Sequence, residues 1–192
     1  DEDISAFRIG FLPEDFERDD FFHETDSVAI DVLGEMGIDL IPVALPDYPI
    51  YPLGIILSAE AAAAFDELTR SGRDDLLVRQ IRNAWPNAFR TARLIPAVEY
   101  IQANRLRTMI MREMEDLDVD IYVSPSFGEN LLLTNLTGHP CVVLPNGYDP
   151  DGNPVSITFI GQPFEEGKLL AFARAYQEET GFHLKHPPLF TK

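Results

Sequence analysis

Three short apolar runs in the second half of the chain have the pattern of buried strands. They cover Val119–Val123, Cys141–Leu144 and Val155–Ile160. Each run is too short for a free-standing helix, is rich in β-branched residues and is bounded by Pro, Gly or Asn, which is typical of strands inside a sheet. The pattern therefore predicts three strands in this part of the chain.

The segments between these runs predict how the strands are connected. Glu129–Thr137 has three leucines at helical spacing and is followed by Gly138, a residue that ends helices in the left-handed conformation. The turn formers at Asn146, Gly147 and Asp149–Gly152 predict a hairpin before the third strand. A parallel first pair followed by an antiparallel return predicts a mixed sheet.

The beginning of the chain predicts a further strand, helix and strand. Phe7–Leu12 alternates as a short strand, and the acidic run Glu14–Asp20 after it indicates a solvated loop. Apolar residues keep to one helical face from about Thr25 until Gly37, and Ile38–Val43 is again apolar. We expect a right-handed crossover between the two strands.

The middle of the chain predicts helices. In order they are Ala59–Arg70, Asp74 to about Trp85, a short turn at Ala88–Leu94 and the longest helix at Pro96–Asp116. Ser58 is expected to cap the first of them, and Pro86 is expected to end the second. The four prolines of Pro42–Pro52 indicate an exposed connector. A last amphipathic helix is predicted at Glu165–Thr180, with Gly181 as its cap.

Length and composition are those of one globular domain. The chain has 192 residues, of which 45% are hydrophobic and 24% charged. With the elements above, this predicts a single α/β domain over residues 1–192, built on a mixed, largely parallel sheet flanked by helices. The net charge of −17 argues against a nucleic-acid or anionic-membrane surface, because phosphate binding needs clustered Lys and Arg.

The single cysteine and the absence of a long apolar run bear on where the protein works. Cys141 is unable to form an internal disulfide, and no run approaches the length that spans a bilayer. We therefore expect a reducing, cytoplasmic setting. The first residue is Asp rather than Met, which favours a fragment or a processed chain.

Four motifs in the second half resemble, in this order, those of the amidase signature family. They are Asp120–Pro125 (D-x-x-x-x-P), Asn135–Pro140 (N-x-x-G-x-P), Leu144–Gly147 (P-x-G) and Gly152–Gly161 (G-x-P, ending in Gly). The segments Leu94–Arg105 and Arg8–Phe11 are similar to that family too. The resemblance implies hydrolysis or transfer of carboxamides, and the family includes the glutamyl-tRNA amidotransferase subunit that releases ammonia from glutamine.

The resemblance also implies a catalytic centre that this sequence does not contain. The family uses a serine nucleophile in a Gly/Ser-rich loop, a second serine in a cis peptide and an upstream lysine, which has to be neutral to accept a proton. This chain has seven serines, no two adjacent, and no lysine before Lys168. We assign no catalytic residue here, and we expect the Ser-cisSer-Lys centre to lie in a missing N-terminal part.

The evidence for other catalytic or metal-binding residues in the chain is weaker. Cys141 and His139 stand close together, but residues two apart around a proline are poorly placed as a nucleophile and its base, and a buried cysteine usually acts as a small hydrophobe. His183 and His186 lack further ligands at matching spacing. We therefore expect no metal and no cofactor.

Pocket-wall residues are predicted at the end of the first of the three strands. Ligands of open α/β sheets bind at the carboxyl ends of strands, which makes Pro125, Ser126, Phe127 and Gly128 substrate-binding candidates. A loop that only fills its own corner is an equal alternative. Asn135 is a further candidate, although a bond from its side chain to the backbone of a neighbouring loop is favoured.

The interpretation is that the chain is the C-terminal part of an amidase-signature amidohydrolase, which supplies substrate-pocket walls and support for the fold. Two alternatives stay open, a non-catalytic α/β binding or interaction module and a fragment of an amidotransferase A-type subunit. The expected partner is a small-molecule amide, with no nucleic acid and no membrane. An unpaired strand edge would also predict self-association or pairing with the missing N-terminal part.

Overall fold

The computed structural model describes residues 4–17 and 23–186, and its chain divides into two compact units. One unit comprises Asp1–Pro46 and Glu113–Lys192, and we call it the sheet unit. The other comprises Asp47–Arg112, and we call it the helical unit. Each unit is described by itself, and a single domain over residues 1–192 stays a prediction.

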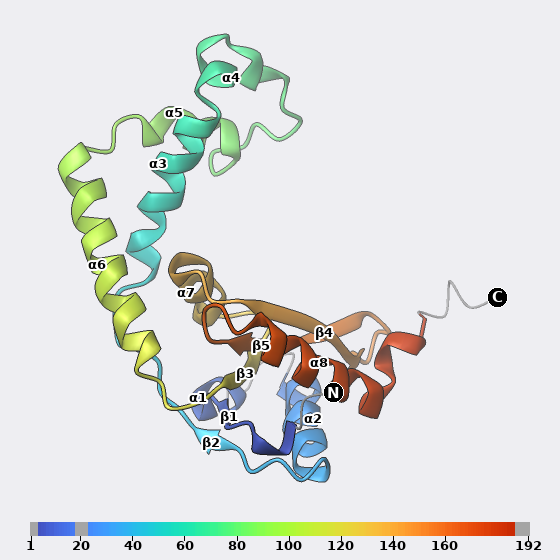
Figure 1. The fold of residues 1–192 in the computed structure, drawn as a ribbon. Coiled ribbons are helices and arrows are strands. Elements are labelled where there is room, and N and C mark those ends of the chain that lie inside the picture. Colours follow the sequence, from blue (N-terminus) through green and yellow to red (C-terminus); the bar gives the residue numbers. More distant parts are fainter. Residues whose placement is uncertain (1–3, 18–22, 187–192) are drawn as a thin grey trace. The chain divides into compact units, whose positions relative to one another are not determined.

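The sheet unit is built on a five-stranded mixed sheet with the order β2-β1-β3-β5-β4 (Figure 1). The strands are β1 (Ile9–Phe11), β2 (Ile41–Pro42), β3 (Ile121–Pro125), β4 (Cys141–Tyr148) and β5 (Pro154–Gly161). β1 pairs in parallel with β2 and β3, whereas β5 pairs antiparallel with β3 and β4. The predicted mixed α/β sheet is therefore confirmed.

The strand order corrects one expectation. β3 and β4 are not neighbours, because β5 lies between them, with Ile121 opposite Gly161 and Cys141 opposite Ile160. The burial of the two hairpin strands gives the reason. β5 is buried at nearly every residue from Ile157 onward and is better covered at the centre, whereas β4 alternates between exposed and buried residues and lies at the edge.

The helices of the sheet unit agree closely with the sequence pattern. They are α1 (Pro13–Phe16), α2 (His23–Glu35), α7 (Glu129–Thr137) and α8 (Glu166–Thr180), with short 3₁₀ turns η1 (Ile4–Ala6) and η4 (Phe182–Leu184). Gly138 and Gly181 end α7 and α8 at positive φ, as predicted. The start of the acidic run is not a loop, because Pro13 opens the short helix α1. Residues 18–22 of that run lie outside the described residues.

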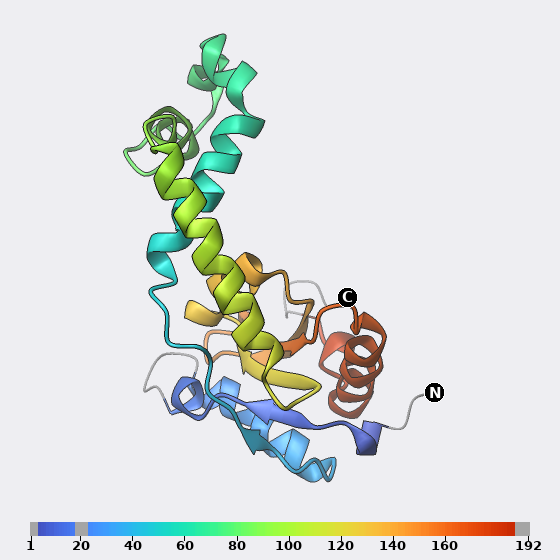
Figure 2. The same cartoon turned by 60° about the vertical axis from the view of Figure 1, so that its left-hand side comes forward.

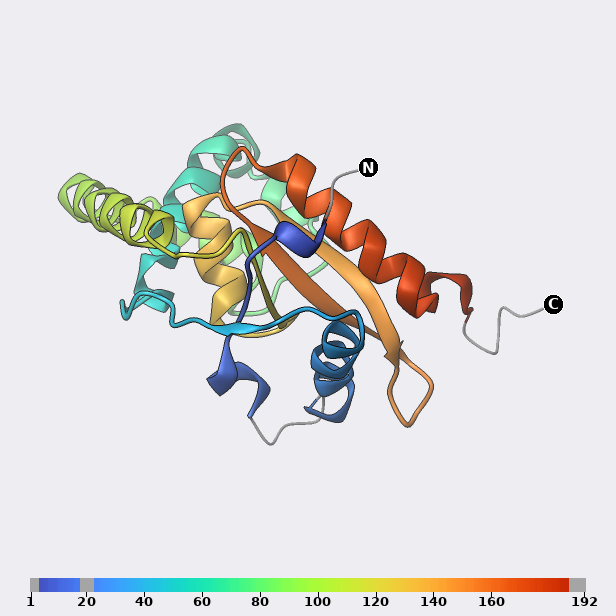
Figure 3. The same cartoon turned by 60° about the horizontal axis from the view of Figure 1, so that its bottom comes forward.

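The main core lies on one face of the sheet. α2 and α8 both pack against β4 and β5 (Figure 3). Phe159 of β5 meets Phe172 and Tyr176 of α8 at ring-centre distances of 5.4 and 5.0 Å, in edge-on geometry. Side chains of the alternate register, including Tyr122, Ser124 and Thr158, point to the opposite face, which leaves that face for the site described below.

The helical unit contains 3₁₀ turns and short helices that precede the long helix α6. The elements are η2 (Tyr51–Gly54), α3 (Ile55–Ala64), α4 (Asp66–Arg70), η3 (Arg73–Leu76), α5 (Trp85–Ala92) and α6 (Ala97–Glu115), the last of which runs into the sheet unit. α3 and α5 lie side by side (Figure 2). α6 was predicted to within one residue at each end. None of the described helices combines the length and apolarity needed to cross a membrane.

Two helix predictions in this unit are wrong. The segment Ala59–Arg70 is not one helix, since α3 already begins at Ile55 and is interrupted at Phe65. Ser58 does not cap it, because it lies inside α3 and its Oγ donates to the carbonyl of Gly54 at 3.1 Å.

The helix expected from Asp74 to Trp85 is also absent. Only the turn η3 forms there, and Pro86 opens α5 instead of ending a helix, because the first turn needs no N–H at that position. Arg90 of α5 forms ion pairs with Asp74 and Asp75 of η3 at 2.5 and 2.6 Å, which links η3 to α5.

Candidate functional site

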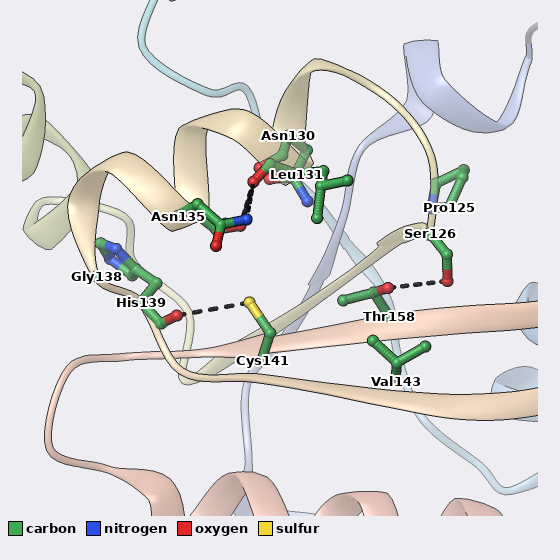
Figure 4. Close-up of a pocket in the computed structure, with 11 residues that line it drawn as sticks. Pro125, Ser126, Asn130, Leu131, Asn135, Gly138, His139, Cys141, Val143 and Thr158 are labelled. Carbon is green, nitrogen blue, oxygen red and sulfur yellow. Dashed lines mark hydrogen bonds between the residues drawn. The ribbon is translucent and has the colours of Figure 1, made fainter. Parts of the chain in front are cut away.

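A pocket of about 370 Å³ lies between α7 and the face of the sheet that α2 and α8 leave open (Figure 4). The end of β3 and the loop after it contribute Pro125 and Ser126. The remaining lining residues come from α7 and its end, from β4 and from β5, and they are Asn130, Leu131, Thr134, Asn135, Gly138, His139, Cys141, Val143 and Thr158. All of these positions belong to the sheet unit.

Three of the five predicted substrate-binding residues line this pocket. Pro125 and Ser126 do so from the end of β3, and Asn135 does so from α7. Phe127 and Gly128 are not part of the lining, and the Phe127 side chain is 68% exposed. The expected bond from Asn135 to a neighbouring loop is wrong, because its Nδ2 donates to the Leu131 carbonyl of its own helix at 2.7 Å.

Residues that the sequence did not single out form much of the pocket. Asn130 and Thr134 stand four apart on α7, so both face the sheet, and the pattern of two polar residues within a leucine-rich helix was the available signal. Val143 and Thr158 are opposite each other in the β4–β5 register. Their place in the pocket depends on this register, because a shift of one residue would turn a side chain to the other face of the sheet, away from the pocket.

A chain of three hydroxyl groups crosses the pocket floor where β3 ends beside β5. Ser156 Oγ donates to Ser126 Oγ at 3.0 Å, and Ser126 Oγ lies 2.9 Å from Thr158 Oγ1. The antiparallel register places these strands together, with Ser124 opposite Thr158. Ser124 itself donates to the carbonyl of Pro125 and takes no part in the chain.

The Asn130 side chain is held in one orientation. The hydroxyl of the buried Tyr122 donates to Asn130 Oδ1 at 2.8 Å. Burial raises the pKa of Tyr122 above its ordinary value, so this donor keeps its proton. Because Oδ1 is engaged in this bond, the side-chain NH₂ group of Asn130 is the part that can donate to a ligand.

The neighbouring cysteine and histidine do not form a nucleophile and base. Cys141 Sγ lies 3.5 Å from the backbone carbonyl of His139, and not against its imidazole. His139 Nδ1 lies 2.8 Å from Thr137 Oγ1, which donates to Leu133, so Nδ1 carries the hydrogen. Burial lowers the pKa of His139. Cys141 is exposed, and not buried as the sequence suggested, but partial desolvation of its thiol raises its pKa, so both groups favour their neutral forms.

Asp120, at the start of the first family-like motif, has a structural role in this chain. Its carboxylate accepts the backbone N–H of Arg8 at 2.9 Å and the ammonium of Lys168 at 3.2 Å, which ties β1, β3 and α8 together. Burial raises the pKa of Asp120, but the two hydrogen bonds outweigh it and leave the pKa below its ordinary value. The bond to Asp120 also raises the pKa of Lys168, so this lysine is charged.

The described residues hold no group of three His, Cys, Asp or Glu side chains arranged to bind a metal ion. His183 lies in η4, and His186 is the last described residue. The pocket lining offers hydroxyl, amide, thiol, imidazole and apolar groups. Such a wall can orient an uncharged ligand, and it contains no activated nucleophile.

No family model matches the chain. Its fold is that of the amidase-signature enzymes, since a bacterial aryl acylamidase of that family superposes on 94% of this chain with a TM-score of 0.75, at 17% identity, over 45% of its own length.

Relatives by sequence agree with the fold. The A-type subunit of the glutamyl-tRNA(Gln) amidotransferase from Chloroflexus aggregans is 29% identical over 97% of this chain and 47% of its own length. An amidase of Pseudomonas putida is 26% identical over 97% of this chain and 46% of its own length. The chain is thus similar in sequence to A-type amidotransferase subunits and to an amidase, and it spans about half the length of the curated relatives it matches.

Proposed function

We propose that the chain is the C-terminal part of an amidase-signature amidohydrolase that hydrolyses carboxamides. In this proposal the chain supplies one wall of the substrate pocket and supports the fold, while the Ser-cisSer-Lys centre lies in residues outside it. The observation that carries the proposal is the similarity to an amidase and to an A-type amidotransferase subunit over 97% of the chain. The pocket on the open face of the sheet is the place where the chain would meet substrate.

The titratable groups of the sheet unit support this division of roles. A catalytic lysine has to be neutral, whereas Lys168 is held in ion pairs with Asp120 and Glu165 at 3.2 and 3.4 Å. Cys141 faces a carbonyl oxygen and has a raised pKa, so it is a poor nucleophile. The barrier to acyl transfer would then be lowered by groups that this chain meets in the complete enzyme.

The substrate contacts proposed here are Pro125, Ser126, Phe127, Gly128 and Asn135. Pro125, Ser126 and Asn135 line the pocket, which supports their assignment. Phe127 and Gly128 follow directly in the chain and would act at the rim, where the exposed Phe127 ring can limit the bulk of a substrate. Each contact orients the amide and is not expected to take part in bond making.

A second candidate is an amidotransferase A-type subunit. It is favoured by the similarity to the glutamyl-tRNA(Gln) amidotransferase of Chloroflexus aggregans. In this alternative the complete protein would release ammonia from glutamine for transfer to tRNA. The net charge of −17 disfavours binding to tRNA, so hydrolysis of small amides is preferred here. A non-catalytic binding module with the same fold is the remaining alternative.

The proposal includes the setting and the partners of the chain. A small amide is the proposed ligand, in a cytoplasmic protein that binds neither nucleic acid nor membrane. β4 lies at an edge of the described sheet, and its Val143 is 57% exposed. Such an edge pairs readily with other strands. We propose that it is covered by the N-terminal part of the complete enzyme or, when the chain is isolated, by a second copy.

Ammonia release tests the proposal directly. The complete gene product should release ammonia from simple alkyl and aryl amides, whereas the 192-residue chain alone should stay at the rate of buffer. Substitution of the candidate thiol, Cys141→Ala, is the control for chemistry within the chain. Turnover by the isolated chain that disappears in this variant would overturn the proposed division, and a complete gene product inactive on every amide would overturn the function.

A further inference from the structure

The hydroxyl chain on the pocket floor has one more hydrogen than it uses. Ser156, Ser126 and Thr158 bring three O–H groups, and two hydrogen bonds join them. Ser156 donates to Ser126, so its hydrogen is used. If Ser126 donates to Thr158, the Thr158 hydrogen is left over, and if Thr158 donates, the Ser126 hydrogen is left over. In both cases the spare donor sits on a residue that lines the pocket.

The surroundings of this donor are uncharged. None of the described residues that line the pocket is Asp, Glu, Lys or Arg, and burial lowers the pKa of His139, which favours its neutral form. Two of the exposed lining residues are apolar, with Leu131 50% and Val143 57% exposed. An ionic group placed here would lose its water without gaining an opposite charge, which is unfavourable.

We infer that this wall recognises the carbonyl oxygen of an uncharged amide with an apolar substituent, and that it rejects glutamine. The spare O–H of the Ser126–Thr158 pair donates to the carbonyl, and the NH₂ group of Asn130, oriented by Tyr122, is a second donor on the same wall. Leu131 and Val143 contact the substituent. The inference rests on the proposed function and narrows its substrate class.

The number of hydroxyl hydrogens predicts that single and double variants differ in their effect. Removing Thr158's hydroxyl leaves Ser126 with a free hydrogen, and removing Ser126's hydroxyl leaves Thr158 with one. Each single variant therefore keeps a hydroxyl donor in the pocket, whereas Ser126→Ala combined with Thr158→Val removes it and leaves only the Asn130 NH₂ group. Ser156 is not part of the pocket lining, and Ser156→Ala also keeps a hydroxyl donor. The loss in the double variant should thus exceed the product of the single losses.

The test compares butyramide with L-glutamine in the complete gene product. Butyramide is the glutamine side chain without its ammonium and carboxylate groups, so the pair isolates the effect of charge. We expect kcat/KM for butyramide to be at least about tenfold higher than for glutamine. In the double variant the carbonyl keeps only the Asn130 NH₂ group and has no hydroxyl donor. We accordingly expect the double variant to lose about tenfold or more in kcat/KM for butyramide, with each single variant within about threefold.

Controls separate this inference from folding and from the proposed function. Thr180→Val removes a hydroxyl that bonds within α8, outside the pocket, and should leave all kinetics unchanged. Thermal unfolding checks that the double variant is folded. Preference for glutamine, or a folded double variant as active on butyramide as the single variants, would overturn the inference while amide hydrolysis stands. Absence of turnover on either amide by the unsubstituted protein would overturn the proposed function and this inference together.

Discussion

The sheet unit and the helical unit differ sharply in charge. Residues 47–112 contain nine arginines, no lysine and seven Asp or Glu, a net charge of +2. The rest of the chain has six Lys or Arg against 25 Asp or Glu, a net charge of −19. In the helical unit the carboxylates Asp66, Glu67, Asp74 and Asp75 each pair with arginine. The net charge of the whole chain therefore reflects the acidic sheet unit and not the helical unit.

The two units also differ in how they use apolar residues. In the sheet unit, the apolar runs of β3 and β5 are buried, and Phe159 is wholly inaccessible. In the helical unit, Leu76, Val78 and Leu94 are among the most exposed side chains of the described residues. Stacked rings of Phe65, Phe89 and Trp85 form a small cluster there, with centre distances of 4.9 and 5.5 Å. Ile56, Phe89 and Ile110 of the helical unit are buried, so hydrophobicity predicts burial in both units, but it does so for fewer of the large apolar side chains in the helical unit.

The largest difference should appear when a core ring is removed. Phe159→Ala deletes a side chain in contact with Phe172 and Tyr176, and we expect a loss of about 3–5 kcal/mol in the free energy of unfolding. Val78→Ala in the helical unit should change it by less than about 0.5 kcal/mol. Urea unfolding followed by circular dichroism measures both. Equal effects would contradict the contrast drawn between the units.

Asp120 should stabilise the sheet unit in a manner that depends on pH. Asp120→Asn weakens the bonds to the Arg8 N–H and to Lys168, and we expect it to cost about 1–3 kcal/mol at neutral pH. The folded pKa is lowered, so this stability is present above the unfolded pKa and is lost as pH falls through the folded pKa. Unfolding curves from about pH 7 to about pH 2 should therefore converge for the two proteins. A constant difference at every pH would show that the carboxylate charge is not the cause.

Self-association of the isolated chain should respond to salt. Repulsion between acidic copies opposes pairing at the β4 edge, and added salt screens it, so the dimer fraction should rise between about 10 and 150 mM NaCl, where the Debye length falls from about 30 to about 8 Å. Val143→Lys places a charge on this edge and should reduce the dimer. Light scattering on a sizing column measures both. A monomer at tens of micromolar in both salts would remove the edge as an association site.

The smallest expected effect concerns Ser58. As a helix cap it would contribute about 1 kcal/mol, but its hydroxyl bonds back to Gly54 inside α3, so Ser58→Ala should change the free energy of unfolding by less than about 0.5 kcal/mol. Thr91→Ala is the matched control, because its hydroxyl makes the same kind of bond to Asn87 in α5. A loss near the full capping value for Ser58 alone would restore the predicted start of the helix.

These outcomes show which features a sequence can specify. The bounds of α7 and its end at Gly138 followed from local signals, because leucine spacing and a glycine at positive φ act within a few residues. The position of β5 between β3 and β4 did not follow, because it depends on which strand gains most from burial on both faces. Pro86 was ambiguous, since proline both ends and begins helices.

The candidate site was predictable to a similar extent. Pro125 and Ser126 were found because a strand's carboxyl end is a general position for ligands. Thr158 and Asn130 were missed, because their place depends on the antiparallel register and on which face of α7 meets the sheet. The spare hydroxyl hydrogen is a property of three residues from two segments, so it appears only when the distances between them are known.

The central claim, that this chain forms a substrate-selecting wall, is tested most directly by specificity within the complete gene product. Leu131→Ala enlarges the pocket mouth at a half-exposed residue, so stability should hardly change. Phe127→Ala alters the rim beside it. The ratio of kcat/KM for a bulky aryl amide to that for butyramide should rise about tenfold in Leu131→Ala, which is the lower end of what one methylene in an apolar pocket contributes. The rise should be smaller in Phe127→Ala. An unchanged ratio in both folded variants would contradict the account.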